Sequence, residues 1–146
     1  MIARRLLQAA VVIGSLSPLL IGGIGIVHSP AAFSGLVEWP RDLDSHFRYL
    51  CGIFFATGIG FLSCVPAIER RGPRFRLLGG LIVCGGLARA VSLMSVGVPG
   101  TGHLIGLGVE LGIMPALMLW QAGFARRYLA SVTAPSSPAP TSALGR

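Results

Sequence analysis

Two charged residues lie inside apolar segments of this sequence. Arg89 interrupts the apolar run 77–98, and Glu110 interrupts the run 104–123. If these runs lie in lipid, each buried charge costs at least a few kcal/mol, so such residues face the interior of a helix bundle and usually have a partner. Arginine and glutamate form charge-assisted hydrogen bonds with each other. We therefore expect an ion pair between Arg89 and Glu110.

The depths of these two residues are compatible with pairing. Arg89 lies nine residues before Val98, and Glu110 lies six residues after Leu104. At 1.5 Å per residue, these spacings correspond to depths of about 14 Å and about 9 Å. A short connection makes the two runs antiparallel neighbours. The difference in depth is shorter than an arginine side chain, so the pair can form.

Further polar residues are expected at the same level. His103 precedes Glu110 by seven residues and therefore lies on the same helix face, and Ser92 is about one turn from Arg89. At the start of another apolar run, Asp44 and Arg48 have the i,i+4 spacing of a helical ion pair. With His46, these residues form a candidate polar cluster: Asp44, His46, Arg48, Arg89, Ser92, His103 and Glu110.

Three interpretations of this cluster are open. It can be a structural ion pair with hydrogen-bonded neighbours that fixes the register of the helices. It can be a pocket for a small anionic or amphiphilic ligand or a lipid headgroup, since arginine offers planar, forked donors. It can also be catalytic, with His46 or His103 as a general base that Glu110 or Asp44 orients. We recognise no positioned nucleophile and no oxyanion hole, so we assign no catalytic residue and favour a protein that is not an enzyme.

The cysteines do not indicate a metal site. No pair among the three cysteines has the spacing of a zinc or redox site, and we expect these residues to pack as small apolar side chains. The sequence therefore predicts neither a metal site nor a cofactor.

Four apolar runs position the candidate cluster, at residues 6–27, 47–68, 77–98 and 104–123. A membrane-spanning helix needs about 20 apolar residues. The sequence is 53% hydrophobic and 12% charged, with a mean hydropathy of +0.75, and soluble domains contain about 25% charged residues. We predict an all-α, integral membrane four-helix bundle within residues 1–130. Residues 131–146, rich in Pro, Ser and Ala, are predicted to be a disordered tail.

The arginines predict the orientation of this bundle. Nine of the twelve would lie on one side of the membrane if the N-terminus is cytoplasmic, against two on the other side, Arg41 and Arg48. The positive-inside rule then gives a topology with both termini inside (N-in/C-in). The Arg-rich loop 69–76 either binds anionic lipid headgroups or acts in topology alone, and we favour topology. The arginines form no single basic face with interleaved aromatic residues, so nucleic acid is not an expected partner.

Small residues recur every four positions on two of the runs. These stripes let helix backbones approach closely, either within one bundle or across a dimer interface. The residues are Gly52, Ala56, Gly60 and Cys64 on the second run, and Gly108, Gly112 and Ala116 on the fourth.

Several segments together resemble a known family. They are the segment 45–52 (SHFRYLCG), 68–70 (IER) before a basic turn, 85–93 (GGLARAVSL), and Glu110-Leu111 followed by Pro115 and Trp120-Gln121. The chain is similar over about residues 5–127 to the bacterial membrane family DUF4345, a domain of unknown function. The resemblance implies four transmembrane helices and no established activity, cofactor or substrate.

The expected protein is thus a multi-pass protein of the bacterial cytoplasmic (inner) membrane, with a small binding or accessory role. Its expected partners are the lipid bilayer, an anionic lipid or small amphiphilic ligand, and either further copies of itself or a larger membrane complex. Two alternatives remain open: an oligomeric transporter or channel-like protein, and a membrane enzyme that acts on a lipophilic substrate.

Overall fold

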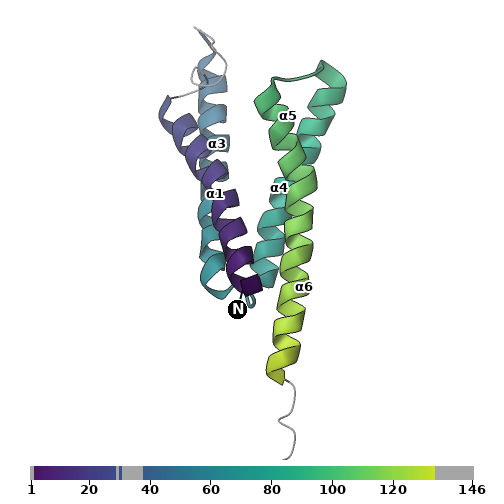
Figure 1. The fold of residues 1–146 in the computed structure, drawn as a ribbon. Coiled ribbons are helices and arrows are strands. Elements are labelled where there is room, and N and C mark those ends of the chain that lie inside the picture. The colour runs from purple at the N-terminus through teal and green to yellow at the C-terminus, as the bar shows by residue number, and fades with distance from the viewer. Residues whose placement is uncertain (1, 29, 31–37, 134–146) are drawn as a thin grey trace, which may run out of the picture.

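The computed structural model describes residues 2–28, 30 and 38–133, and its regular elements are all helical. In chain order they are α1 (Ile2–His28), α3 (Arg41–Cys64), the 3-10 helix η1 (Val65–Ala67), α4 (Gly72–Val96), α5 (Thr101–Gly108), the π-helical segment η2 (Val109–Ile113) and α6 (Met114–Thr133). The last three follow one another without a break (Figure 1). Within the described residues, four helical segments are long and apolar enough to cross a membrane: Ile2–His28, Arg41–Ala67, Gly72–Val96 and Thr101–Thr133.

The prediction of an all-α chain with four long helices is confirmed, but the helices extend beyond the apolar runs. The first begins at Ile2 instead of residue 6, and the second begins at Arg41 instead of residue 47. Backbone hydrogen bonds do not require apolar side chains, so a helix continues into its polar flanks. The last helix reaches Thr133, so residues 131–133, which we expected in the tail, are helical. The rest of the predicted tail lies outside the described residues.

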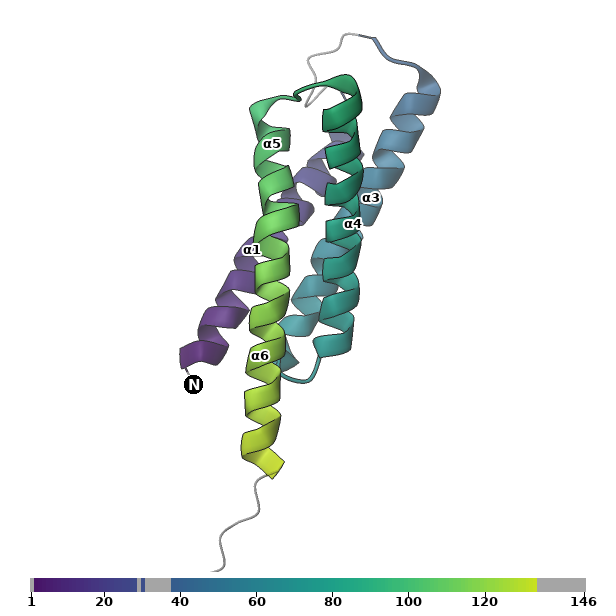
Figure 2. The same cartoon turned by 90° about the vertical axis from the view of Figure 1, so that its right-hand side faces the viewer.

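The helices are arranged as two arms. α1 packs against α3 along its length, and α4 packs against η2 and α6. Figure 1 shows the arms close together where α1 begins and far apart at the opposite end; Figure 2 shows the same arrangement from the side, with α1 crossing behind α6. We call the first region the N-terminal end and the second the turn end, after the turn between α4 and α5.

The buried core joins the two arms towards the N-terminal end. Phe61 of α3 and Phe75 of α4 meet edge to face, with ring centroids 5.2 Å apart and an interplanar angle of 74°. The other fully or nearly buried apolar side chains of this cluster come from α1, α3, the segment after η1, and α6: Leu7, Val11, Cys64, Ile68 and Met114. A core placed at one end leaves the turn ends of the arms free to diverge.

Glycines set how closely the helices approach. A Cβ atom added at Gly22 would lie 2.9 Å from the carbonyl oxygen of Cys51, so α1 and α3 are in backbone contact there. By contrast, Cβ atoms added at Gly52, Gly108 or Gly112 would meet nothing within 4 Å among the described atoms. Among the described residues, the glycines of the predicted stripe on the fourth run therefore mediate no helix packing.

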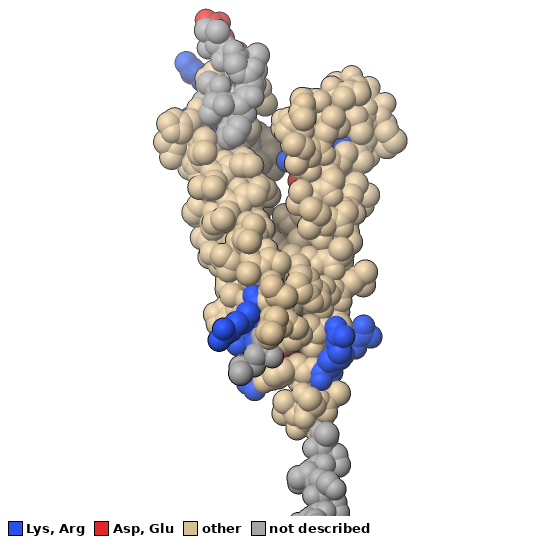
Figure 3. All heavy atoms as spheres, in the orientation of Figure 1, with Lys and Arg blue, Asp and Glu red and all other residues tan. Residues whose placement is uncertain are grey.

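The surface between the two ends is apolar. In Figure 3 the outward surface of both arms between the ends is a band with almost no charged atoms; a few are visible where the arms face each other, and basic atoms gather at the N-terminal end. Large hydrophobic residues such as Leu77 and Leu119 are exposed, at 66% and 74%. Soluble monomers rarely expose continuous apolar surface of this extent. This band is suited to contact with lipid or protein rather than water.

Candidate functional site

The expected ion pair between Arg89 and Glu110 is present. Arg89 Nε lies 3.3 Å from Glu110 Oε1, and the side chains are 44% and 11% exposed respectively. Arg89 is seven residues before the end of α4 at Val96, and Glu110 is nine residues after the start of α5 at Thr101. At 1.5 Å per residue, both lie roughly 10–14 Å from the turn-end limits of their helices.

The backbone around Glu110 departs from a regular α-helix. Glu110 lies in the π-helical segment, where the Met114 N–H donates to the Val109 carbonyl five residues earlier. Pro115 follows directly; it has no N–H to donate to the carbonyl of Leu111, and its ring crowds that carbonyl. Wide turns of this kind occur often at functional sites. Proline at this position thus gives a local reason for the altered turn that carries Glu110.

His103 is the second partner of Arg89. Arg89 Nη1 lies 3.0 Å from His103 Nδ1. A guanidinium group only donates hydrogen bonds, so Nδ1 must accept, and in this arrangement the ring carries its proton on Nε2. His103 therefore offers an N–H donor rather than an unoccupied basic Nδ1, which does not suit the role of general base at that atom.

Arg89 and His103 line a cavity of about 220 Å³, which we call the polar pocket. It is formed by Arg89, Ser92, Leu93, Pro99, His103 and Leu107. Arg89 Nη2 makes no hydrogen bond to any described residue, and neither does the hydroxyl of Ser92. Three of the six lining residues are apolar, so the pocket joins hydrogen-bond donors to a nonpolar wall.

The other three residues of the predicted cluster lie on α3. Arg48 Nε is 2.8 Å from Asp44 Oδ2, and Trp39 donates to Asp44 Oδ1 at 3.0 Å. Arg48 Nη1 also donates to the carbonyl oxygens of Ile26 and Val27, at the end of α1. These contacts connect the last turn of α1 to the start of α3.

The seven predicted residues thus divide into two groups. Arg89, His103 and Glu110 are in contact, with Ser92 beside them, whereas Asp44 and Arg48 pair on the other arm. The exposed ring of His46 faces Tyr49, with centroids 6.4 Å apart. No hydrogen bond or ion pair joins the two groups within the part of the chain that the structure describes. The arms diverge at this end, so equal depth along the helices does not place these groups together.

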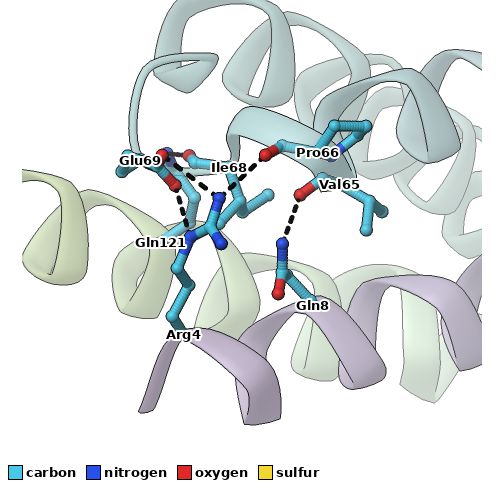
Figure 4. Close-up of polar contacts among 7 residues, drawn as sticks. All are labelled: Arg4, Gln8, Val65, Pro66, Ile68, Glu69 and Gln121. Atoms are coloured by element: carbon cyan, nitrogen blue, oxygen red, sulfur yellow. Dashed lines mark hydrogen bonds and ion pairs between the residues drawn. The ribbon is translucent and has the colours of Figure 1, made fainter. Parts of the chain in front are cut away.

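A second polar network, which the sequence analysis did not identify, lies at the N-terminal end (Figure 4). Arg4 Nε and Nη2 lie 3.0 and 3.3 Å from the two carboxylate oxygens of Glu69, and Nη2 also donates to the Pro66 carbonyl at 2.8 Å. Burial raises the pKa of Glu69. The hydrogen bond from Arg4, a backbone hydrogen bond and the nearby positive charges outweigh that effect, so this pKa lies below its usual value.

Two glutamines extend the network into the bundle. Gln8 donates to the Val65 carbonyl at 2.7 Å, and the fully buried Gln121 donates to the Ile68 carbonyl at 2.8 Å. They satisfy backbone carbonyls where the second helical segment ends, which is a need of every helix terminus. Their positions inside apolar runs were the signal that could have revealed this network.

The comparison with protein families supplies the identification. The family model for the domain of unknown function DUF4345 matches residues 6–121. The chain belongs to the DUF4345 family. This match covers every residue of the polar pocket and Glu69, whereas its partner Arg4 lies just before the matched residues. No curated protein and no solved structure matches the chain. The family's name assigns no function, and the geometry of the site is the available guide to one.

Proposed function

We propose that this DUF4345 protein is a small multi-pass binding or accessory protein of the bacterial cytoplasmic membrane, with both termini in the cytoplasm. The polar pocket then lies in the outer leaflet and holds the anionic headgroup of an amphiphile. The four apolar helices and the apolar band in Figure 3 support insertion. The basic residues at the N-terminal end support the orientation, because such residues are enriched on the cytoplasmic side.

One observation carries the proposed binding role. The guanidinium of Arg89 is held by Glu110 and His103, yet it stays 44% exposed and keeps Nη2 free of hydrogen bonds to described residues. Arg89 lies roughly 10 Å from the end of its helix. At that depth in a membrane, hydrogen-bond donors of a charged group are costly unless they have a polar partner. An anion seated against Nη2 would supply that partner.

The rest of the polar pocket suits the same ligand. His103 and Ser92 line the same cavity, and an imidazole N–H and a hydroxyl can both donate to carboxylate or phosphate oxygens. Glu110 offsets the charge of Arg89 and fixes the orientation of the guanidinium group. Arg89 therefore contributes oriented hydrogen-bond donors to the pocket rather than a net positive charge. This arrangement favours a headgroup that accepts several hydrogen bonds.

The size of the cavity decides which part of the ligand enters it. Pockets for whole drug-sized ligands have volumes of about 300–1,000 Å³, and this one has about 220 Å³. The headgroup therefore occupies the pocket, and the hydrocarbon chain lies outside it, against the apolar band.

The experiment compares charged and neutral amphiphiles on the full chain in a non-ionic detergent. The probes are decanoate and decyl phosphate, with decyl maltoside as the neutral control, and the readout is the thermal unfolding midpoint. We expect either anionic probe to raise the midpoint by a few degrees, which corresponds to about 1 kcal/mol in a chain of this size. Decyl maltoside should not raise it.

The variants test whether the effect arises in the polar pocket. Arg89→Gln should abolish the stabilisation, and so should Ser92→Leu, which fills the cavity and keeps the ion pair. Arg48→Gln is the matched control, because Arg48 also pairs with a carboxylate near the turn end and is 40% exposed. Equal stabilisation of Arg89→Gln and Arg48→Gln, or none for the unaltered protein, would contradict the proposal.

A further inference from the structure

A larger cavity of about 530 Å³ lies at the N-terminal end, and we call it the basic pocket. The loop before α4, the first turns of α4 and the second half of α6 form it, through Glu69, Arg70, Gly72, Pro73, Arg76, Ala122, Ala125, Arg126 and Leu129. It is separate from the polar pocket, which lies at the other end of the molecule. Figure 3 shows basic atoms gathered at the end of the apolar band where this pocket lies.

Three arginines of the basic pocket have guanidinium N–H donors that bond to no described residue. The guanidinium groups of Arg70 and Arg76 form no ion pair or hydrogen bond with described residues. Among the described residues, the Arg126 guanidinium donates only from Nε, to the Ala122 carbonyl at 3.4 Å. A planar guanidinium fork matches the oxygens of phosphate. The pocket thus offers several donors for one anion.

The one acid that lines the basic pocket forms its ion pair with Arg4 and not with these arginines. Both oxygens of Glu69 are already bonded to Arg4, at 3.0 and 3.3 Å, on the side of α1 (Figure 4). Glu69 keeps its charge because its pKa lies below the usual value. Its ion pair is therefore with Arg4, and none of the three pocket arginines forms an ion pair with a described carboxylate, although the charge of Arg70 contributes to the lowered pKa of Glu69.

The remaining lining is apolar and small. Pro73, Ala122, Ala125 and Leu129 form the wall beside the arginines. An apolar wall makes no favourable contact with a free inorganic ion, which is hydrated on all sides. It can, however, contact the glycerol and upper acyl chain of a lipid. Its position at the edge of the apolar band places it at the depth of lipid headgroups.

We propose that the basic pocket binds the phosphate of an anionic phospholipid, with the lipid's glycerol and acyl region against the wall formed by α6. This inference depends on the membrane insertion proposed above but not on a ligand in the polar pocket. It changes the role expected for the Arg-rich loop, from topology alone to lipid binding through a built cavity that also includes Arg126.

The test uses the full chain in nanodiscs with equal amounts of phosphatidylglycerol and phosphatidylcholine. Native mass spectrometry of the released protein measures how much phosphatidylglycerol it retains. Arg126→Gln should reduce retention about five-fold, which is about 1 kcal/mol, the usual contribution of one basic residue at a lipid surface. Arg127→Gln should leave it nearly unchanged. This control is closely matched, because Nε of each arginine donates to the carbonyl four residues earlier, at 3.2 Å for Arg127 and 3.4 Å for Arg126. Arg127, however, does not line the pocket.

Three further measurements make each outcome decisive. Ala125→Leu fills the cavity without a change of charge and should also lose the lipid; retention at the unaltered level would overturn the proposal. Equal loss in Arg126→Gln and Arg127→Gln would assign the effect to general surface charge and overturn it as well. Inorganic phosphate should not displace the lipid, and complete displacement would make free phosphate the ligand instead. Arg89→Gln should retain phosphatidylglycerol, so failure of the polar-pocket proposal remains distinguishable from failure of this one.

Discussion

The close approach of α4 to the segment that carries Glu110 leads to a sharp prediction for Gly86. An added Cβ atom there would lie 2.8 Å from Leu111 Cδ2 and 2.9 Å from Glu110 Cβ, both closer than real Cβ atoms approach. Gly85, the neighbouring residue in the same helix, has nothing within 4 Å of the same added atom among the described residues. Gly86→Ala therefore forces the two segments apart, and Gly85→Ala does not.

The comparison of these two variants isolates the cost of the clash. Both gain the same helix propensity, about 0.5–1 kcal/mol for alanine over glycine. Overpacking of a well-packed contact costs about 1–3 kcal/mol. We expect Gly85→Ala to be unchanged or slightly more stable than the unaltered protein. Gly86→Ala should be less stable than Gly85→Ala by about 1–3 kcal/mol.

Reversible unfolding in mixed micelles, followed by circular dichroism, measures this difference. Gly86→Ala should also weaken the response to decanoate, because a displaced Glu110 no longer orients Arg89. Equal stability of the two alanine variants would refute the reasoning, since it would mean that α4 and the π-helical segment do not approach each other as described.

Three other predictions concern the rest of the fold. Gly22→Ala should destabilise the protein by about 1–3 kcal/mol more than Gly23→Ala, measured in the same unfolding assay, because an added Cβ at Gly22 meets backbone atoms of α3 at 2.9 Å and one at Gly23 meets a ring at 3.7 Å. The pKa of Glu69 is lowered in the folded protein, so its contribution to stability is present above the usual carboxylate pKa and is lost as the pH falls through the lowered value. Glu69→Gln should accordingly flatten the acid side of a plot of unfolding midpoint against pH, and an unchanged slope would count against the Arg4 contact. In a background with the native cysteines replaced by alanine, a membrane-impermeant maleimide should label Gly100→Cys but not Arg70→Cys in intact cells; the reverse pattern would invert the proposed topology.

The sequence was sufficient to predict the helices and the central contact. Arg89 and Glu110 could be paired because each interrupts an apolar run, and a short turn forces the two runs side by side. Helix count and type followed from the length of the apolar runs. These inferences succeed because they depend on local spacing and on the cost of an unpaired charge in an apolar setting.

Other features depend on how the helix pairs pack, which spacing does not determine. Asp44 and Arg48 lie at the same end as Arg89, but on an arm that diverges from it, so equal depth did not bring them together. The network around Glu69 was not predicted, because charged residues in the flanks of apolar runs were explained by topology alone. The altered turn at Glu110 is an exception, because Pro115 affects the carbonyl four residues earlier by a local rule.

The central claim, that the polar pocket holds an anionic amphiphile, is tested most directly by identification of what the protein carries from a bacterial membrane. The protein would be extracted in a mild detergent and analysed by native mass spectrometry, in an Arg126→Gln background that weakens lipid binding in the basic pocket. We predict a bound acidic amphiphile that Arg48→Gln retains and Arg89→Gln loses. The same adduct on both variants, or no adduct on the background protein, would contradict the claim.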